Sequence, residues 1–200
     1  FWETDITPNL IQGWDIFKND AIDFLNQNNL NNSIAIGHSM GAIIALLIQL
    51  EFPGTFKKIF LLDPVITSWV KSLVYKMLLK IRLIDQLHPM IQRTNSKKMK
   101  YSNKEEIYEN YRKKNIFSKL NDKALSDYID SIITDDDNGI KIKLSQKWEN
   151  TIYRNGSIHD YWIWKNIKGV NIPIYVITPE NNEFGHFNYG RLLKSRNNNF

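Results

Sequence analysis

Cysteine is absent from this 200-residue sequence, so no disulfide framework, thiolate metal site or thiol nucleophile can be built from it. Long hydrophobic runs are missing too. The most apolar stretch, around residues 43–48, is far shorter than the roughly 18 residues that cross a bilayer. No basic and apolar leader pattern stands at the N-terminal end. We therefore expect a cytoplasmic protein without stable membrane insertion.

The motifs that hold nucleotides are also absent, because neither G-x-G-x-x-G nor G-x-x-x-x-G-K occurs. The segment TDDDNG at residues 134–139 resembles part of a calcium loop, but Ser145 stands where a glutamate ligand is needed. We interpret the segment as a turn and expect neither a metal nor another cofactor. A hydrophobic content of 42% in 200 residues is enough for a compact domain with a sizeable core.

The net charge of +5 is regional. Between Lys71 and Lys114 there are twelve Lys or Arg against four Asp or Glu, a local +8, so the remainder of the chain carries −3. No helix-turn-helix, zinc-finger or RNP-like pattern accompanies this basic region, and no nucleic-acid partner is expected. A solvated helical face is favoured, and attraction to an anionic substrate or a membrane surface is the alternative.

The pentapeptide GHSMG at residues 37–41 lies between a short apolar run, residues 34–36, and a longer one, residues 42–52. A G-x-S-x-G sequence between a strand and a helix is typical of a nucleophile elbow. The serine stands on a strained turn, and small residues on both sides let the strand and the helix approach closely. The pattern predicts that Ser39 is a nucleophile and that Gly37 and Gly41 are both needed for packing.

Periodicity around this motif predicts a β-α-β unit in a parallel sheet that is covered on both faces. Its parts are a strand at residues 33–37, a helix at 40–52 and a strand at 56–63, preceded by an amphipathic helix at 14–27. A third strand, at 172–178, follows after about a hundred residues, too many for a plain loop. Within that gap we predict an inserted helical subdomain, with helices near 69–83, 104–114 and 122–133.

Three stretches of the sequence resemble the α/β-hydrolase family, in particular bacterial serine hydrolases with a helical cap: SIAIGHSMGA, IFLLDPV and IPIYVIT. The resemblance implies an α/β fold, a parallel sheet of the α/β-hydrolase type with a helical cap insertion. It places a first core part at residues 1–66, the cap at 67–168 and a second core part at 169–200. Against the family pattern, the N-terminal strands and the C-terminal strand and helix are missing, so we expect an internal fragment of a longer protein.

The resemblance also implies the roles of individual residues. Ser39 is the expected nucleophile, and the backbone N–H of Met40 is the expected oxyanion donor. Glu183 falls on the position of the acid, while Glu180 and Asp63 remain alternatives. Gly37 and Gly41 are the elbow glycines.

The family's general base is a histidine after an eighth strand, which places it beyond Phe200. The four histidines of the sequence are interpreted otherwise. His38 is expected to pack away from Ser39, and His88 and His159 are expected at the surface or in a pocket of the cap. His186 is too close in sequence to Glu183 to occupy a separate loop. We expect the chain by itself to be almost inactive, because triad members act as a unit.

The sequence therefore predicts a serine hydrolase, such as an esterase, that acts on a small apolar acyl or ester substrate. Aromatic residues are expected to roof the pocket, among them Trp69, Tyr75, Trp148, Tyr153 and Trp162. A non-catalytic ligand-binding member of the fold, an acyltransferase and a C–C bond hydrolase are alternatives. The sequence leaves the oligomeric state open.

Overall fold

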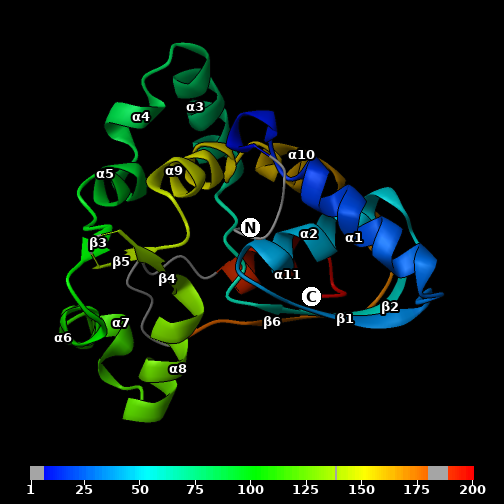
Figure 1. Cartoon of the computed structure of the whole chain (residues 1–200). Helices are drawn as coiled ribbons and strands as arrows, with labels where there is room; N and C mark the ends of the chain where they lie inside the picture. The colour runs from blue at the N-terminus through cyan, green and yellow to red at the C-terminus, as the bar shows by residue number, and fades with distance from the viewer. Residues whose placement is uncertain (1–6, 138, 180–188) are drawn as a thin grey trace. The chain divides into compact units, whose positions relative to one another are not determined.

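The computed structural model describes residues 7–137, 139–179 and 189–200 (Figure 1). The chain separates into two compact units, which we call the insert unit (Phe1–Pro8 and Gln86–Tyr153) and the core unit (Asn9–Asp85 and Arg154–Phe200). The segments next to both ends of residues 86–153 fold with the core unit. In the described part of the chain, no helix is both long enough and apolar enough to cross a membrane.

The core unit is an α/β structure. Its elements are α1 (Asp15–Gln27), β1 (Ser33–His38), α2 (Met40–Glu51), β2 (Phe56–Leu62), α3 (Trp69–Lys80), α10 (Asp160–Asn166), η2 (Ile167–Gly169), β6 (Ile174–Ile177) and α11 (Tyr189–Arg196). Three short elements span the unit boundaries or lie beside them: η1 (Pro8–Leu10), α4 (Ile84–Leu87) and α9 (Gln146–Asn155).

The strands of the core unit form a parallel sheet in the order β1-β2-β6. In the register, Phe60 of β2 lies between Ile36 of β1 and Tyr175 of β6. The predicted β-α-β unit is confirmed, and the third predicted strand pairs with the free side of β2. Strand β1 lies at one edge of the described sheet.

Only one face of this sheet is covered. Helix α2 packs against β1 and β2, and α1 packs against α2, so that Ile59 and Leu61 have no solvent exposure. Figure 1 shows α1, α2 and α11 on one side of the strands. On the other face, Ile36 is 70% exposed and Ile177 is 54% exposed. The expectation of a sheet covered on both faces is therefore wrong for the described residues, although both faces are apolar.

Among the described elements, helix α2 supplies the largest share of the core, because it is apolar around its circumference, as a buried helix should be. Seven of its residues are buried: Ala42, Ile43, Ala45, Leu46, Leu47, Ile48 and Gln49. Gln49 is the polar member, and its Oε1 accepts a hydrogen bond of 3.1 Å from the backbone N–H of Phe56, the first residue of β2. The end of α2 is thus tied to the start of the next strand.

The insert unit is not purely helical. Its elements are α5 (Pro89–Asn95), β3 (Lys100–Tyr101), α6 (Lys104–Arg112), α7 (Asn115–Ser118), α8 (Asp122–Ile132), β4 (Ile133–Asp136) and β5 (Gly139–Ile142). The predicted helices at α3, α6 and α8 are confirmed, but β3, β5 and β4 form an antiparallel sheet. These strands have two to four residues, too few for a clear alternation of apolar and polar residues in the sequence.

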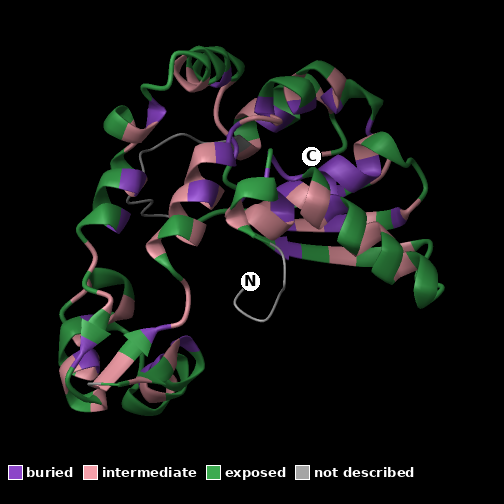
Figure 2. Cartoon of the chain, turned by 45° about the horizontal axis from the view of Figure 1, so that its top comes forward, coloured by how far each residue is buried: buried purple, intermediate pink, exposed green. Residues whose placement is uncertain are grey.

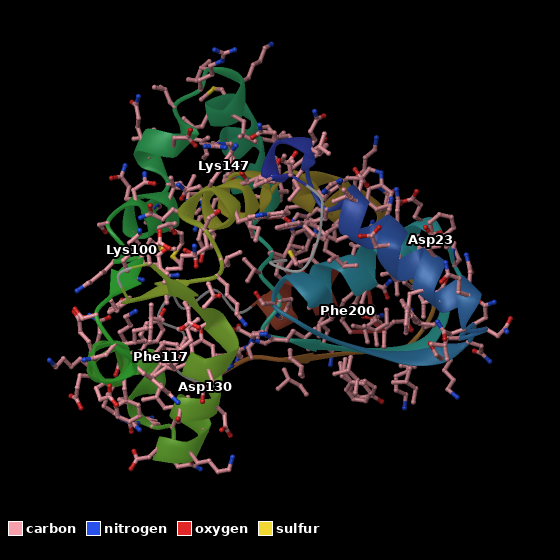
Figure 3. The ribbon with its side chains drawn as sticks, viewed as in Figure 1. Asp23, Lys100, Phe117, Asp130, Lys147 and Phe200 are labelled. Carbon is pink, nitrogen blue, oxygen red and sulfur yellow. The ribbon has the colours of Figure 1, made fainter. Side chains whose placement is uncertain are left out.

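A separate hydrophobic cluster stabilises the insert unit. It contains Tyr101, Ile107, Tyr111, Leu125, Ile129, Ile132 and Ile142. The Phe117 ring, labelled in Figure 3, packs at this cluster, with its centroid 5.2 Å from that of Tyr111 and 4.9 Å from that of Tyr128. The side chains of Asn103 and Asn121 cap α6 and α8. The unit therefore has its own core and its own helix-starting signals.

Candidate active site

Ser39 occupies the turn between β1 and α2 and has φ 53° and ψ −117°. A non-glycine residue rarely adopts a positive φ, and such strain persists only where the surrounding structure enforces it. Here the Ser39 N–H donates to the carbonyl of Leu62 on β2 at 2.9 Å, which extends the parallel ladder into the turn. The sharp strand-to-helix turn thus carries Ser39 at the carboxyl end of the sheet.

The two glycines of the motif differ in their surroundings. A Cβ at Gly37 would lie 2.5 Å from the carbonyl carbon of Gly41 and 2.6 Å from the nitrogen of Ala42. Glycine at position 37 is therefore required by the close approach of strand and helix. A Cβ at Gly41 would meet nothing within 4 Å. The structure thus gives no steric reason for a glycine at position 41, although the sequence predicted that both glycines are needed for packing.

Met40 is the first residue of α2, and the N–H groups of the first helical turn have no acceptor within their own helix. The partial positive charge of the helix N-terminus adds to their attraction for an anion. Ser39 precedes this helix without a capping hydrogen bond from its side chain, so its hydroxyl is not occupied as a cap. The backbone can place a nucleophilic oxygen next to an anion-binding N–H.

Asp63 follows β2 directly, as Ser39 follows β1, and their preceding residues, Leu62 and His38, are register partners. Asp63 has φ 44°, and its N–H donates to the carbonyl of Ile177 at 2.7 Å. It therefore lies at the same carboxyl end of the sheet as Ser39, in a strained turn. Glu183, the preferred acid, and Glu180 lie outside the described residues, so the choice among the three acids stays open.

No described histidine forms a hydrogen bond with Ser39. His38 is exposed at the end of β1, and our expectation that it packs is wrong. His88 caps α5 by accepting from the N–H of Met90 at 3.2 Å, and burial lowers its pKa. His159 belongs to the core unit, where its Nε2 lies 3.1 Å from the carboxylate of Asp15. His186 lies outside the described residues.

One buried carboxylate was not singled out from the sequence. Asp160 has no solvent exposure, and its Oδ2 accepts from the N–H of Thr67 at 2.8 Å and from the Thr67 hydroxyl at 2.7 Å. Burial raises the pKa of Asp160 to about 6, and the bonds from Thr67 oppose that rise. The Trp164 indole N–H donates to the Thr67 carbonyl at 2.6 Å. Through Asp160 and Trp164, helix α10 therefore fixes Thr67 in the segment that follows β2. No local signal in the sequence predicts the contact between Asp160 and Thr67.

Two grooves lie in the core unit. The first, of about 300 Å³, is lined by Trp69, Leu73, Tyr161, Trp164, Lys165 and Arg196. The second, of about 350 Å³, is lined by Asp15, Lys18, Leu47, Glu51, His159 and Trp162. Ser39 lines neither groove. The five aromatic residues predicted to roof one pocket do not share either of them, since only Trp69 and Trp162 are present and each lines a different groove.

Comparison with known proteins identifies a protein family whose model matches this chain. A family model described as serine aminopeptidase, S33, matches residues 7–131, which is more than half of the chain. A search of the curated proteins gave no match.

Solved structures with the same fold are longer than this chain. The thioesterase domain from the curacin biosynthetic pathway superposes with a TM-score of 0.64 at 14% identity, over 96% of this chain and 64% of that one. The peroxisomal α/β-hydrolase Lpx1 from Saccharomyces cerevisiae gives a TM-score of 0.57 at 19% identity, over 82% of this chain and 42% of that one. For E-2-(acetamidomethylene)succinate hydrolase the TM-score is 0.59 at 12% identity, with 95% and 74% covered. At these identities the likeness shows the fold alone.

Proposed function

Because the chain belongs to the serine aminopeptidase S33 family of α/β hydrolases, we propose that it carries the nucleophile of a serine hydrolase that cleaves an ester or related acyl bond. The observation that carries this proposal is the backbone of Ser39, with its positive φ between the end of β1 and the start of α2. A serine that only decorated a turn would have no need of this strain.

In the proposed reaction, Ser39 Oγ attacks the acyl carbon, and the hydroxyl proton passes to a general base. The carbonyl oxygen becomes an oxyanion, which accepts a hydrogen bond from the Met40 N–H. Collapse of this intermediate expels the leaving alcohol with the proton and leaves an acyl-serine. Water then releases the acid and restores Ser39.

The proposal gives Glu183 the role of orienting the base, with Asp63 as the alternative at the same carboxyl end of the sheet as Ser39. It assigns the base itself to a histidine that this sequence does not contain, as the family resemblance implies. Chemical rescue can test that assignment, because added imidazole can take the place of a missing histidine as proton acceptor.

The experiment is labelling of this chain with a fluorophosphonate, followed by peptide mapping. We expect slow phosphonylation of Ser39 that becomes faster when imidazole is added. The label should be absent from Ser39→Ala and unchanged in Ser195→Ala, a control at an exposed serine of α11. Labelling that persists in Ser39→Ala would remove Ser39 from the proposal.

A second candidate is a ligand-binding protein without catalysis, favoured by the absence of a hydrogen-bonded side chain at the Ser39 hydroxyl among the described residues. It predicts that an apolar ester raises the melting temperature of the wild type and of Ser39→Ala equally. In that case the ester would not be hydrolysed, either with added imidazole or on long incubation. Release of either product would contradict this candidate.

A further inference from the structure

Helix α3 presents an apolar surface that the other described elements of the core unit leave about half exposed. Six apolar side chains, spaced so that they share one side of the helix, are between 42% and 56% exposed: Trp69, Val70, Leu73, Val74, Met77 and Ile81. Figure 2 shows that most of α3 is exposed, in contrast to α2. We call these six residues the α3 face. A contiguous apolar surface on a helix marks an interaction site.

The opposite side of α3 is fixed to the core unit. Ser72 has no solvent exposure, and its Oγ donates to the carbonyl of Ser157 at 3.2 Å. The same oxygen accepts from the N–H of Tyr161 at 3.0 Å, at the start of α10. The α3 face is therefore directed to solvent by contacts behind it, and the helix does not depend on a partner for its position.

Positive charge surrounds the α3 face. Lys71, Lys76, Lys80 and Arg82 are exposed in and directly after the helix, and residues 64–84 contain no Asp or Glu. The carboxylate that follows, Asp85, is engaged by the Arg154 guanidinium through two bonds of 2.7 and 2.8 Å. Apolar residues with a Trp at one end and cations on the flanks are the pattern of a helix that lies in a membrane interface.

The groove of about 300 Å³ continues the α3 face, since Trp69 and Leu73 form part of both. Its remaining lining includes Tyr161 and two cations, Lys165 of α10 and Arg196 of α11. Within the described ranges, neither cation is paired with a carboxylate. The groove thus offers apolar surface beside two exposed cations.

We propose that the α3 face and the adjoining groove bind the surface of an anionic lipid bilayer. The apolar side chains enter the boundary between headgroups and acyl chains, while the flanking cations contact lipid phosphates. A second copy of the chain fits this surface less well, because a symmetric contact would bring the same cations of both copies together. The inference is independent of the serine chemistry proposed above.

Co-sedimentation of the whole chain with vesicles tests the proposal. We expect binding to phosphatidylcholine vesicles that contain about a third of phosphatidylglycerol, and weak binding to phosphatidylcholine alone, because the cations are attracted to an anionic surface. Leu73→Glu and Met77→Glu should each lower the partition coefficient at least tenfold. Added salt should weaken the binding of the wild type.

Two control variants separate this surface from the other exposed apolar regions. Ile116→Glu changes a residue of α7 that is 72% exposed, and Ile36→Glu changes the open face of the sheet. Both should bind vesicles as the wild type does. Binding that is lost in Ile36→Glu and kept in Leu73→Glu would overturn the proposal. Self-association without vesicles that Leu73→Glu abolishes would also overturn it, in favour of a second copy as the occupant.

Discussion

Replacing Gly37 and Gly41 separately by alanine tests whether close packing of β1 against α2 builds the elbow. At Gly37 the new methyl group would meet backbone atoms of Gly41 and Ala42, at 2.5 Å from one carbon and 2.6 Å from one nitrogen. Backbone atoms cannot rotate aside as a flexible side chain can, so α2 must shift. Overpacking of this kind costs about 1 to 3 kcal/mol, and we expect the upper end.

At Gly41 the same substitution meets nothing within 4 Å. Gly41 is the second residue of α2, and alanine is better than glycine within a helix by up to about 1 kcal/mol. The free energy of unfolding of Gly41→Ala should therefore equal or slightly exceed that of the wild type. Each variant adds one methyl group, and the two sites are four residues apart, so each variant serves as the control for the other.

Urea unfolding followed by circular dichroism measures this difference. With a typical slope of about 2 kcal/mol per molar urea, a loss of about 3 kcal/mol lowers the midpoint of Gly37→Ala by about 1.5 M. The Gly41→Ala midpoint should stay within a few tenths molar of the wild type. Equal destabilisation of the two variants would refute the reasoning, because it would mean that Gly41 is packed as closely as Gly37.

Two further predictions concern a buried charge and an open surface. Burial raises the native pKa of Asp160 to about 6, above its ordinary value of 3.8. Its contribution to the unfolding free energy is therefore fully present below pH 4 and is lost as the pH rises through 6, a loss of about 3 kcal/mol. Asp160→Asn should remove that loss, so the stability difference from the wild type should change between pH 4 and pH 7; a difference that is independent of pH would contradict the pKa. We also expect the wild type to self-associate through the open apolar face of the sheet, on which Ile36 and Ile177 lie. In sedimentation velocity, Ile36→Lys combined with Ile177→Lys should reduce this association, whereas Ile116→Lys should not; equal effects of the two changes would contradict the prediction.

Much of the core unit could be predicted because its signals are local. The apolar run of α2, the β-branched strands on either side and the glycine at position 37 each act within a few residues of the chain, and the structure confirms these elements. The candidate nucleophile Ser39 is predicted in the same way, from the pentapeptide and the apolar runs on either side of it. Its positive φ is the structural feature that the pentapeptide predicts.

Other features depended on contacts between residues far apart in the sequence. The sequence could not show that Asp160 accepts hydrogen bonds from Thr67, because 93 positions separate them and neither residue carries a local signal. The short strands of the insert unit form only because β3, β4 and β5 meet each other.

By itself, then, the sequence determined where the β-α-β unit, the third strand of the core sheet and the elbow form, since backbone propensity, apolar periodicity and a glycine act over short distances. Only the tertiary structure decided which apolar residues are buried. Ile36 and Ile59 look alike in the sequence, yet one is 70% exposed and the other has no exposure, because α2 packs on one face of the sheet alone. Burial depends on which elements meet, and that is a property of the assembled chain.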